Sequence, residues 1–203
     1  MSDRGVLIIL SGPSGSGKDT VLNKLVDGRD DVRVSVSMTT RAKRDGEIDG
    51  KHYYFVNREY FEKKIAEGKM LEYAEYAHNY YGTPRKPVEE MLRAGKSVIL
   101  KIEVQGAEKI RRIFPDVTSI FLLPPSMRVL EERLRGRGSE DEETLHHRLV
   151  IAREELRRAY DYDYVVINDT VESAVKGIET VIEAENKKTA RNKNLISEVI
   201  DNV

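Results

Sequence analysis

The sequence predicts an α/β fold built around a parallel β-sheet, and two observations support this prediction. Continuous apolar runs, each as long as a short strand, alternate with segments whose apolar residues repeat at helical spacing. The first run leads directly into a glycine-rich turn, and a helical pattern follows that turn. Strands that alternate with helices in this way are typical of βαβ units.

The predicted strands are buried on both faces, because their apolar residues run on without polar alternation. They cover Val6–Leu10, Val98–Leu100, Ile120–Leu123 and Tyr164–Ile167. Helical spacing follows the first strand and precedes the second, in Val21, Leu22, Leu25 and Val26 and in Val88, Met91 and Leu92. We therefore expect parallel strands joined by helices.

Two stretches interrupt this alternation. Residues 34–84 are rich in Tyr, Thr, Arg and Gly without a long apolar run, which predicts a small inserted subdomain. Residues 135–158 are strongly charged, and Ser139 with Glu142 is a candidate capping box at the start of a helix. That helix carries one apolar stripe, formed by Leu145, Leu149, Ala152 and Leu156. The remaining ranges, 1–33, 85–134 and 159–203, are predicted to form the core of a single domain.

Composition excludes several function classes. The chain has 203 residues and a formal net charge of -1, which gives no overall attraction to nucleic acid or to an anionic membrane. It has no cysteine, so disulfides and thiolate metal sites are excluded. The N-terminal residues lack the pattern of a signal peptide, and the longest aliphatic run is too short to span a bilayer. A cytoplasmic protein without nucleic-acid or membrane partners is expected.

The glycine-rich turn predicts a phosphate-binding loop. Glycines let the backbone fold so that successive N–H groups face an anion, and the following helix adds its positive N-terminal end. Lys18 would reach the terminal phosphates of ATP. The predicted ATP-binding residues of this loop are Gly12, Pro13, Ser14, Gly15, Ser16, Gly17, Lys18, Asp19 and Thr20.

The metal position of this loop departs from the usual pattern. A serine or threonine normally follows the lysine and binds Mg²⁺ through its hydroxyl, whereas this chain has Asp19 and then Thr20. Either Thr20 or Asp19 is expected to serve the Mg²⁺ shell, the latter directly or through water. Without the metal, a carboxylate at this position would repel ATP.

Further motifs follow the phosphate-binding loop along the chain. The first is Ser35-Val36-Ser37-Met38-Thr39-Thr40-Arg41, which Arg44, Gly46-Glu47, Gly50-Lys51 and Tyr53 follow. Later motifs are Leu71-Glu72-Tyr73-Ala74, Asn79-Tyr80-Tyr81-Gly82-Thr83, Val104-Gln105-Gly106, residues 132–138, Arg148 and Ile167-Asn168-Asp169. In their order and spacing these motifs resemble the guanylate kinase family over roughly residues 5–185. The resemblance implies a P-loop NTPase fold with a three-layer core, an inserted GMP-binding subdomain at 34–84 and a helical lid at 135–158.

The resemblance implies a residue set for GMP that suits the chemistry of guanine. A carboxylate can accept from guanine N1 and N2 together, and Glu72 is the matched residue. Ser37 and Thr83 are matched to O6, which accepts hydrogen bonds. The 5′-phosphate requires cationic forks and hydroxyls. Its matched residues are Arg41, Arg44, Tyr53 and Tyr81, and Glu103 is a further candidate for guanine or the Mg²⁺ shell.

Transfer of the γ-phosphate from ATP to GMP or dGMP is the implied reaction. It requires two nucleotides in line and positive charge over the migrating group. The candidate catalytic residues are Lys18, Arg41, Arg133, Arg137 and Arg148. Arg133 and Arg137 are four residues apart and would share one helix face. The glycines beside Arg137 suit a hinge in a closing lid.

Three positions leave the family pattern or allow two interpretations. Lys101 stands where an acid is common, and either pairs with Glu103 or changes metal binding. Lys43 replaces a common proline. Asn168 matches an adenine-contacting position, although an Asn-Asp pair also forms turns.

Two alternative functions stay open. One is a catalytically inactive scaffold domain, and the other is another small-molecule kinase, such as a ribose bisphosphate kinase.

The C-terminal segment carries a short apolar stripe of Leu195, Ile196, Val199 and Ile200. We expect this stripe to pack on its own domain, with a dimer contact as the alternative. A monomer or a homodimer is therefore predicted.

Overall fold

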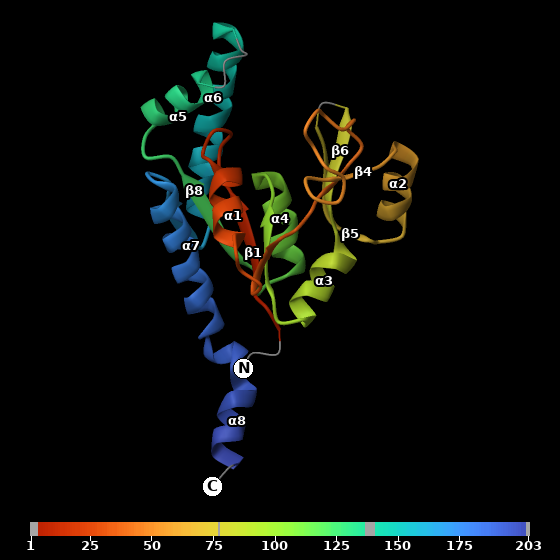
Figure 1. The fold of residues 1–203 in the computed structure, drawn as a ribbon, viewed down its shortest axis with the longest axis vertical. Coiled ribbons are helices and arrows are strands. Elements are labelled where there is room, and N and C mark those ends of the chain that lie inside the picture. The colour runs from red at the N-terminus through yellow and green to blue at the C-terminus, as the bar shows by residue number, and fades with distance from the viewer. Residues whose placement is uncertain (1–3, 77, 137–140, 202–203) are drawn as a thin grey trace.

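A parallel sheet forms the centre of the protein (Figure 1). The computed structural model describes residues 4–76, 78–136 and 141–201. Within these ranges the central sheet has five strands in the order β2-β7-β1-β8-β9. The strands are β1 (Leu7–Ser11), β2 (Val32–Val34), β7 (Ser97–Lys101), β8 (Thr118–Leu123) and β9 (Tyr164–Ile167). The predicted parallel α/β fold is confirmed, and β2 adds a short strand that the sequence analysis did not identify.

Helices cover both faces of this sheet, which explains the uninterrupted apolar runs. On one face, Ile8 and Leu10 pack with α1 (Lys18–Val26) and α7 (Val171–Asn186). On the other face, Leu7 and Ile9 pack with α3 (Arg85–Arg93) and α4 (Val104–Ile113). Successive residues of β1 point to opposite faces, so both sets must be apolar.

A second, smaller sheet lies within the predicted insertion. Among the described residues it has four strands in the order β4-β3-β6-β5. The strands are β3 (Met38–Thr39), β4 (Tyr54–Phe55), β5 (Met70–Tyr76) and β6 (Asn79–Pro84). The helix α2 (Arg58–Ala66) contributes Phe61 to a core shared with Met38 and Met70. The helix begins at an Asn57 cap whose side chain accepts from the Tyr60 backbone N–H.

Two helices form a separate layer over the phosphate loop. They are α5 (Met127–Arg135) and α6 (Glu142–Arg157), with the 3₁₀ turn η1 (Arg158–Asp161) after them. Leu130 and Leu134 of α5 pack with Leu145 and Ala152 of α6. The expected cap at Ser139 lies outside the described residues; α6 is capped instead by Asp141, whose carboxylate accepts from the Thr144 N–H at 2.7 Å.

The C-terminal helix departs from its predicted packing. After η2 (Thr189–Arg191), α8 (Lys193–Asp201) projects from the body of the molecule (Figure 1). No side chain of α8, all of whose residues are described, is buried. Leu195 and Ile196 are 44% and 42% exposed, and Val199 and Ile200 are 68% and 66% exposed. The prediction that this stripe packs on its own domain is therefore wrong.

None of the helices in the described part of the chain combines the length and the apolar character needed to cross a membrane.

Candidate functional site

The phosphate loop runs between the carboxyl end of β1 and the start of α1. The register that pairs Leu10 with Lys101 places this loop beside the end of β7. Gly17 precedes α1 with φ 91° and ψ 19°, a left-handed conformation that glycine adopts without strain. A Cβ at this position would also clash with the side-chain amide of Asn168. The loop therefore requires glycine here for two independent reasons.

Lys18 lies folded against the loop itself. Its Nζ donates to the carbonyl oxygen of Gly12 and, at 3.3 Å, to that of Pro13. Burial lowers the pKa of Lys18 below its ordinary value, while the carboxylates of Glu103, Glu155 and Asp19 act in the opposite direction. The Lys18 ammonium is therefore held at the loop, where it can interact with an anionic phosphate group.

Three side chains from later in the chain brace the loop. Asn168 is buried and donates from Nδ2 to the Ser16 carbonyl at 2.7 Å. Arg133 donates from Nη2 to the Asn168 carbonyl at 2.9 Å, and Arg148 donates from Nη2 to Ser14 Oγ at 2.7 Å. The helices α5 and α6 thus bring Arg133 and Arg148, two of the predicted catalytic residues, to the loop. Arg137 lies outside the described residues, and the adenine contact of Asn168 stays a prediction.

The proposed guanine side of the site centres on a buried carboxylate. Glu72 of β5 and Thr83 of β6 are paired neighbours, and Thr83 Oγ1 donates to Glu72 Oε1 at 2.7 Å. Burial raises the pKa of Glu72, and the bond from Thr83 partly counteracts this effect. Gly106 of α4 lies so close that an added Cβ would be 3.0 Å from Glu72 Oε2. The carboxylate is therefore fixed by two elements.

Ser37 and Thr83 also come together, because β3 pairs with β6. The antiparallel register joins Met38 with Gly82, which brings the preceding Ser37 beside Thr83. In this structure the Thr83 hydroxyl donates its hydrogen bond to Glu72. Thr83 therefore orients the carboxylate, and Ser37 is the hydroxyl left to face an acceptor such as guanine O6.

The residues predicted for the GMP phosphate gather around Arg41. Its guanidinium forms a bidentate pair with Glu47, at 3.0 Å and 2.7 Å, and lies 5.5 Å from the ring centre of Tyr53. The rings of Tyr53 and Tyr81 are 6.1 Å apart. Arg44 is exposed on the same loop, and its backbone N–H donates to Glu47 at 2.8 Å. Glu47, which the sequence analysis left without a role, therefore organises this group.

Replacing Glu47 by glutamine should lower stability in a pH-dependent way. The bidentate bonds from Arg41 lower the pKa of Glu47 from 4.5 to about 2. Because folding lowers the pKa of Glu47, its ionised carboxylate stabilises the fold above pH 4.5. This contribution to the free energy of unfolding is lost as the pH falls toward about 2. The difference in Tm between wild type and Glu47→Gln should therefore be largest near neutral pH and shrink in acid. Glu59→Gln, at an exposed position of α2, is the control; a difference that does not change with pH contradicts the assignment.

Lys101 contacts a partner that the sequence analysis did not anticipate. Its Nζ donates to Asp19 Oδ1 at 2.5 Å, so its direct partner is Asp19 and not Glu103, the first of the two alternatives; an effect on metal binding stays a prediction. Glu103 occupies the position just before α4 without a side-chain cap hydrogen bond and is exposed, and its charge acts on both Lys18 and Lys101. The two departures from the family pattern, at Asp19 and Lys101, are thus joined in space.

A self-sufficient metal cage is not found in the part of the chain that the structure describes, where no three His, Cys, Asp or Glu side chains gather in ligating geometry. Asp19 and Thr20 are both exposed at the start of α1. Mg²⁺ commonly takes one or two protein ligands together with substrate phosphates. The residues therefore fit a metal that arrives with ATP.

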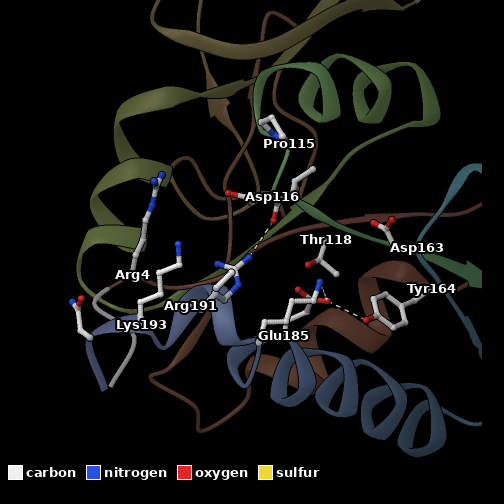
Figure 2. A pocket seen from close by; sticks show the side chains of 13 residues that line it. Arg4, Pro115, Asp116, Thr118, Asp163, Tyr164, Glu185, Arg191 and Lys193 are labelled. Atoms are coloured by element: carbon white, nitrogen blue, oxygen red, sulfur yellow. Dashed lines mark hydrogen bonds and ion pairs between the residues drawn. The ribbon is translucent and has the colours of Figure 1, made fainter. Parts of the chain in front are cut away.

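A cavity of about 730 Å³, shown in Figure 2, lies near the amino ends of the parallel strands, away from the phosphate loop. It opens where β8 and β9 begin, near Thr118 and Tyr164, whereas the phosphate loop follows the end of β1. Tyr164 donates to the buried Glu185 at 3.0 Å within it (Figure 2). Among the described residues that line this cavity, none is a predicted site residue.

The fold and the loop define the chain as a P-loop α/β protein that binds nucleotides. The sequence model of the family described as guanylate kinase matches residues 4–185. The chain therefore belongs to the guanylate kinase family.

Individual relatives agree with this assignment. A guanylate kinase of Synechocystis sp. is 52% identical over 174 residues, which are 86% of this chain and 91% of the relative. One of Lactococcus lactis is 48% identical over 203 residues, covering 100% of this chain and 99% of the relative. The crystal structure of guanylate kinase from Anaplasma phagocytophilum has a TM-score of 0.76 at 40% identity, over 93% of this chain and 89% of that one.

Proposed function

We propose that this protein transfers the γ-phosphate of ATP to GMP, forming ADP and GDP. The observation that carries the proposal is the buried Glu72, held by Thr83 on the small sheet of a chain whose phosphate loop also keeps Gly17 and Lys18 at the start of α1. Loss of the loop would suit a scaffold domain, and a kinase for ribose phosphates would not need this carboxylate. Membership of the guanylate kinase family supports the same conclusion.

Recognition of the base follows from the placement of Glu72. Its carboxylate accepts from guanine N1 and N2 together, and adenine does not offer that pair of donors. Ser37 donates to O6, while Thr83 keeps Glu72 oriented. A base that leaves such buried groups unpaired loses about 1–3 kcal/mol for each stranded group.

The 5′-phosphate of GMP binds at the group around Arg41. The guanidinium is held by Glu47 against the ring of Tyr53, and Tyr81 lies beside that ring. Arg44 adds a second cation on the same loop. Planar forks and phenol hydroxyls match phosphate oxygens well. None of these contacts involves the 2′-hydroxyl, so dGMP is accepted as well.

The transfer step relies on position and charge. A phosphate oxygen of GMP, already anionic, forms a bond to the γ-phosphorus as the bond to the ADP oxygen breaks, so no general base is required. Lys18, Arg41, Arg133 and Arg148 stabilise the charge on the migrating group, together with Arg137 from the undescribed segment. The contacts of Arg133 and Arg148 with the loop support this role.

Mg²⁺ is the expected cofactor. When bound with ATP it neutralises charge on the phosphates. Thr20 and the Asp19 oxygen that Lys101 leaves free are the protein groups that would serve it. Asn168 and the loop residues hold ATP. Whether the protein is a monomer or a homodimer stays a prediction, and so does its cytoplasmic location.

A substrate panel tests the proposal. ADP formation is measured with GMP, dGMP, IMP, AMP, UMP and ribose phosphates as acceptors. We expect GMP and dGMP to be preferred over IMP, which lacks the N2 donor, by about tenfold or more, and over AMP by about 100-fold or more. Preference for a ribose phosphate, or equal rates with GMP and AMP, would refute the function.

A further inference from the structure

Two residues that leave the family pattern, Asp19 and Lys101, form one ion pair at the edge of the phosphate loop. They are 82 residues apart in sequence, and the distance from Lys101 Nζ to Asp19 Oδ1 is 2.5 Å. The parallel register of β1 and β7 produces this contact, because Lys101 stands level with Leu10 just before the loop begins. The contact is therefore built into the central sheet.

The surroundings of Lys18 show why a second cation is useful there. Glu103, Glu155 and Asp19 all place negative charge near the Lys18 ammonium, and Lys101 acts in the opposite sense. An ATP molecule brings further negative charge to the same loop. A carboxylate whose charge is not compensated repels the ATP phosphates when they lie a few ångströms away. The repulsion is strongest where the site is partly shielded from water.

Lys101 is well placed to provide this compensation. Its side chain is 31% exposed, whereas that of Asp19 is 74% exposed. Burial is the largest single influence and favours the neutral form of Lys101, but the bond to Asp19 and the charges of Asp19, Tyr53 and Glu103 together raise the pKa above its ordinary value. Lys101 also interacts electrostatically with Tyr53, a member of the group around Arg41.

We propose that Lys101 is a positioning residue for ATP, acting through Asp19. It holds the Asp19 carboxylate against the end of β7 and cancels its charge toward the phosphates, so that ATP binds although an acid follows the loop lysine. This inference rests on the proposed placement of the ATP phosphates in the loop. Asp19 and Lys101 then form a compensated unit, and a substitution at one position acts through the other.

A double-mutant cycle tests the coupling. The Kd for ATP, measured by titration calorimetry without metal, is compared among wild type, Lys101→Met, Asp19→Asn and the double variant. Lys101→Met should raise the Kd about tenfold, because Asp19 is left uncompensated, and the double variant should recover to within about threefold of wild type. In activity assays with Mg²⁺, Lys101→Met should raise KM for ATP and leave KM for GMP within about twofold.

Further variants separate the proposal from a purely structural role. Lys101→Arg keeps the charge and should bind ATP within about threefold of wild type. Lys86→Met, which removes an exposed lysine paired with Glu90 on α3, is the matched control. If Lys101→Met does not fold, as judged by thermal unfolding, Lys101→Gln takes its place in the cycle.

Two results would overturn the inference: wild-type affinity for ATP in Lys101→Met, or a double variant that binds ATP no better than Lys101→Met. Lys18→Met distinguishes this failure from failure of the proposed function. If Lys18→Met loses ATP while the Lys101 variants show no coupling, the loop site stands and the pair alone is refuted. If Lys18→Met binds ATP normally, the loop site itself is refuted.

Discussion

Replacing Glu72 by glutamine is expected to lower kcat/KM for GMP by at least about 100-fold, because two hydrogen bonds to a charged acceptor are lost or reversed. The amide keeps the size of the side chain but presents an N–H₂ group where guanine also donates. The phosphate loop lies in a different part of the molecule, so the Kd for ATP should stay within about twofold. Steady-state kinetics with each nucleotide varied, and titration with ATP, measure both quantities.

Glu75→Gln is the matched control, because Glu75 lies on the same strand but is exposed and pairs with Arg58. It should keep wild-type kinetics with both nucleotides. Thermal unfolding of Glu72→Gln at neutral pH should show no loss of stability, since burial already disfavours the ionised carboxylate. Equal losses for ATP and GMP in Glu72→Gln would contradict the assignment of Glu72 to the base.

Replacing Lys18 by methionine is expected to lower kcat by about 100-fold to 1,000-fold, the range for removal of one group that stabilises charge in a transition state. ATP affinity should fall as well, because the loop loses its mobile cation. The fold should survive, since the lysine is largely desolvated and methionine has a similar shape. Single-turnover rates, ATP titration and Tm measure these three effects.

Lys24→Met on the same helix is the control, because Lys24 is an exposed residue of the last turn of α1. It should match wild type in rate and Tm. A Lys18→Met variant with the kcat of Lys24→Met would remove Lys18 from the mechanism. A Lys18→Met variant that unfolds would instead point to a structural role for the bonds to the Gly12 and Pro13 carbonyl groups.

Much of the core fold could be predicted from the sequence, because strands buried on both faces have no polar alternation. The run Val6–Leu10 and the glycine loop predicted β1 and the start of α1 closely. The strand β2, Val32–Val34, escaped notice because three residues show no periodicity. The exposed α8 was also mispredicted: an apolar stripe indicates a face that favours burial, but says nothing about which surface is available to cover it.

The residue types of the site could be predicted, but their contacts could not. The pairing of Glu72 with Thr83 depends on the β5–β6 register, which an irregularity between Met70 and Glu72 shifts. From the sequence, Asn168 is a candidate for an adenine contact or a turn, but the bond from its side-chain amide to the Ser16 carbonyl joins segments 152 residues apart and could not be predicted. Glu47 was visible in a motif, but its bidentate bond to Arg41 requires the folded loop.

The partner of Lys101 shows the same limit most clearly. From the sequence, Glu103, two residues along the chain, is a candidate partner of Lys101. Asp19 is considered separately, as a possible ligand of Mg²⁺. The parallel pairing of β1 with β7 brings Lys101 to Asp19 instead. Contacts between the ends of neighbouring parallel strands are set by sheet order, which local patterns do not reveal.

A crystal structure of the protein with GMP tests the central claim most directly. We predict that the guanine lies in the plane of the Glu72 carboxylate, within hydrogen-bond distance of it, with its phosphate among Arg41, Tyr53 and Tyr81. A guanine bound away from Glu72, with that carboxylate still contacting protein alone, would contradict the account.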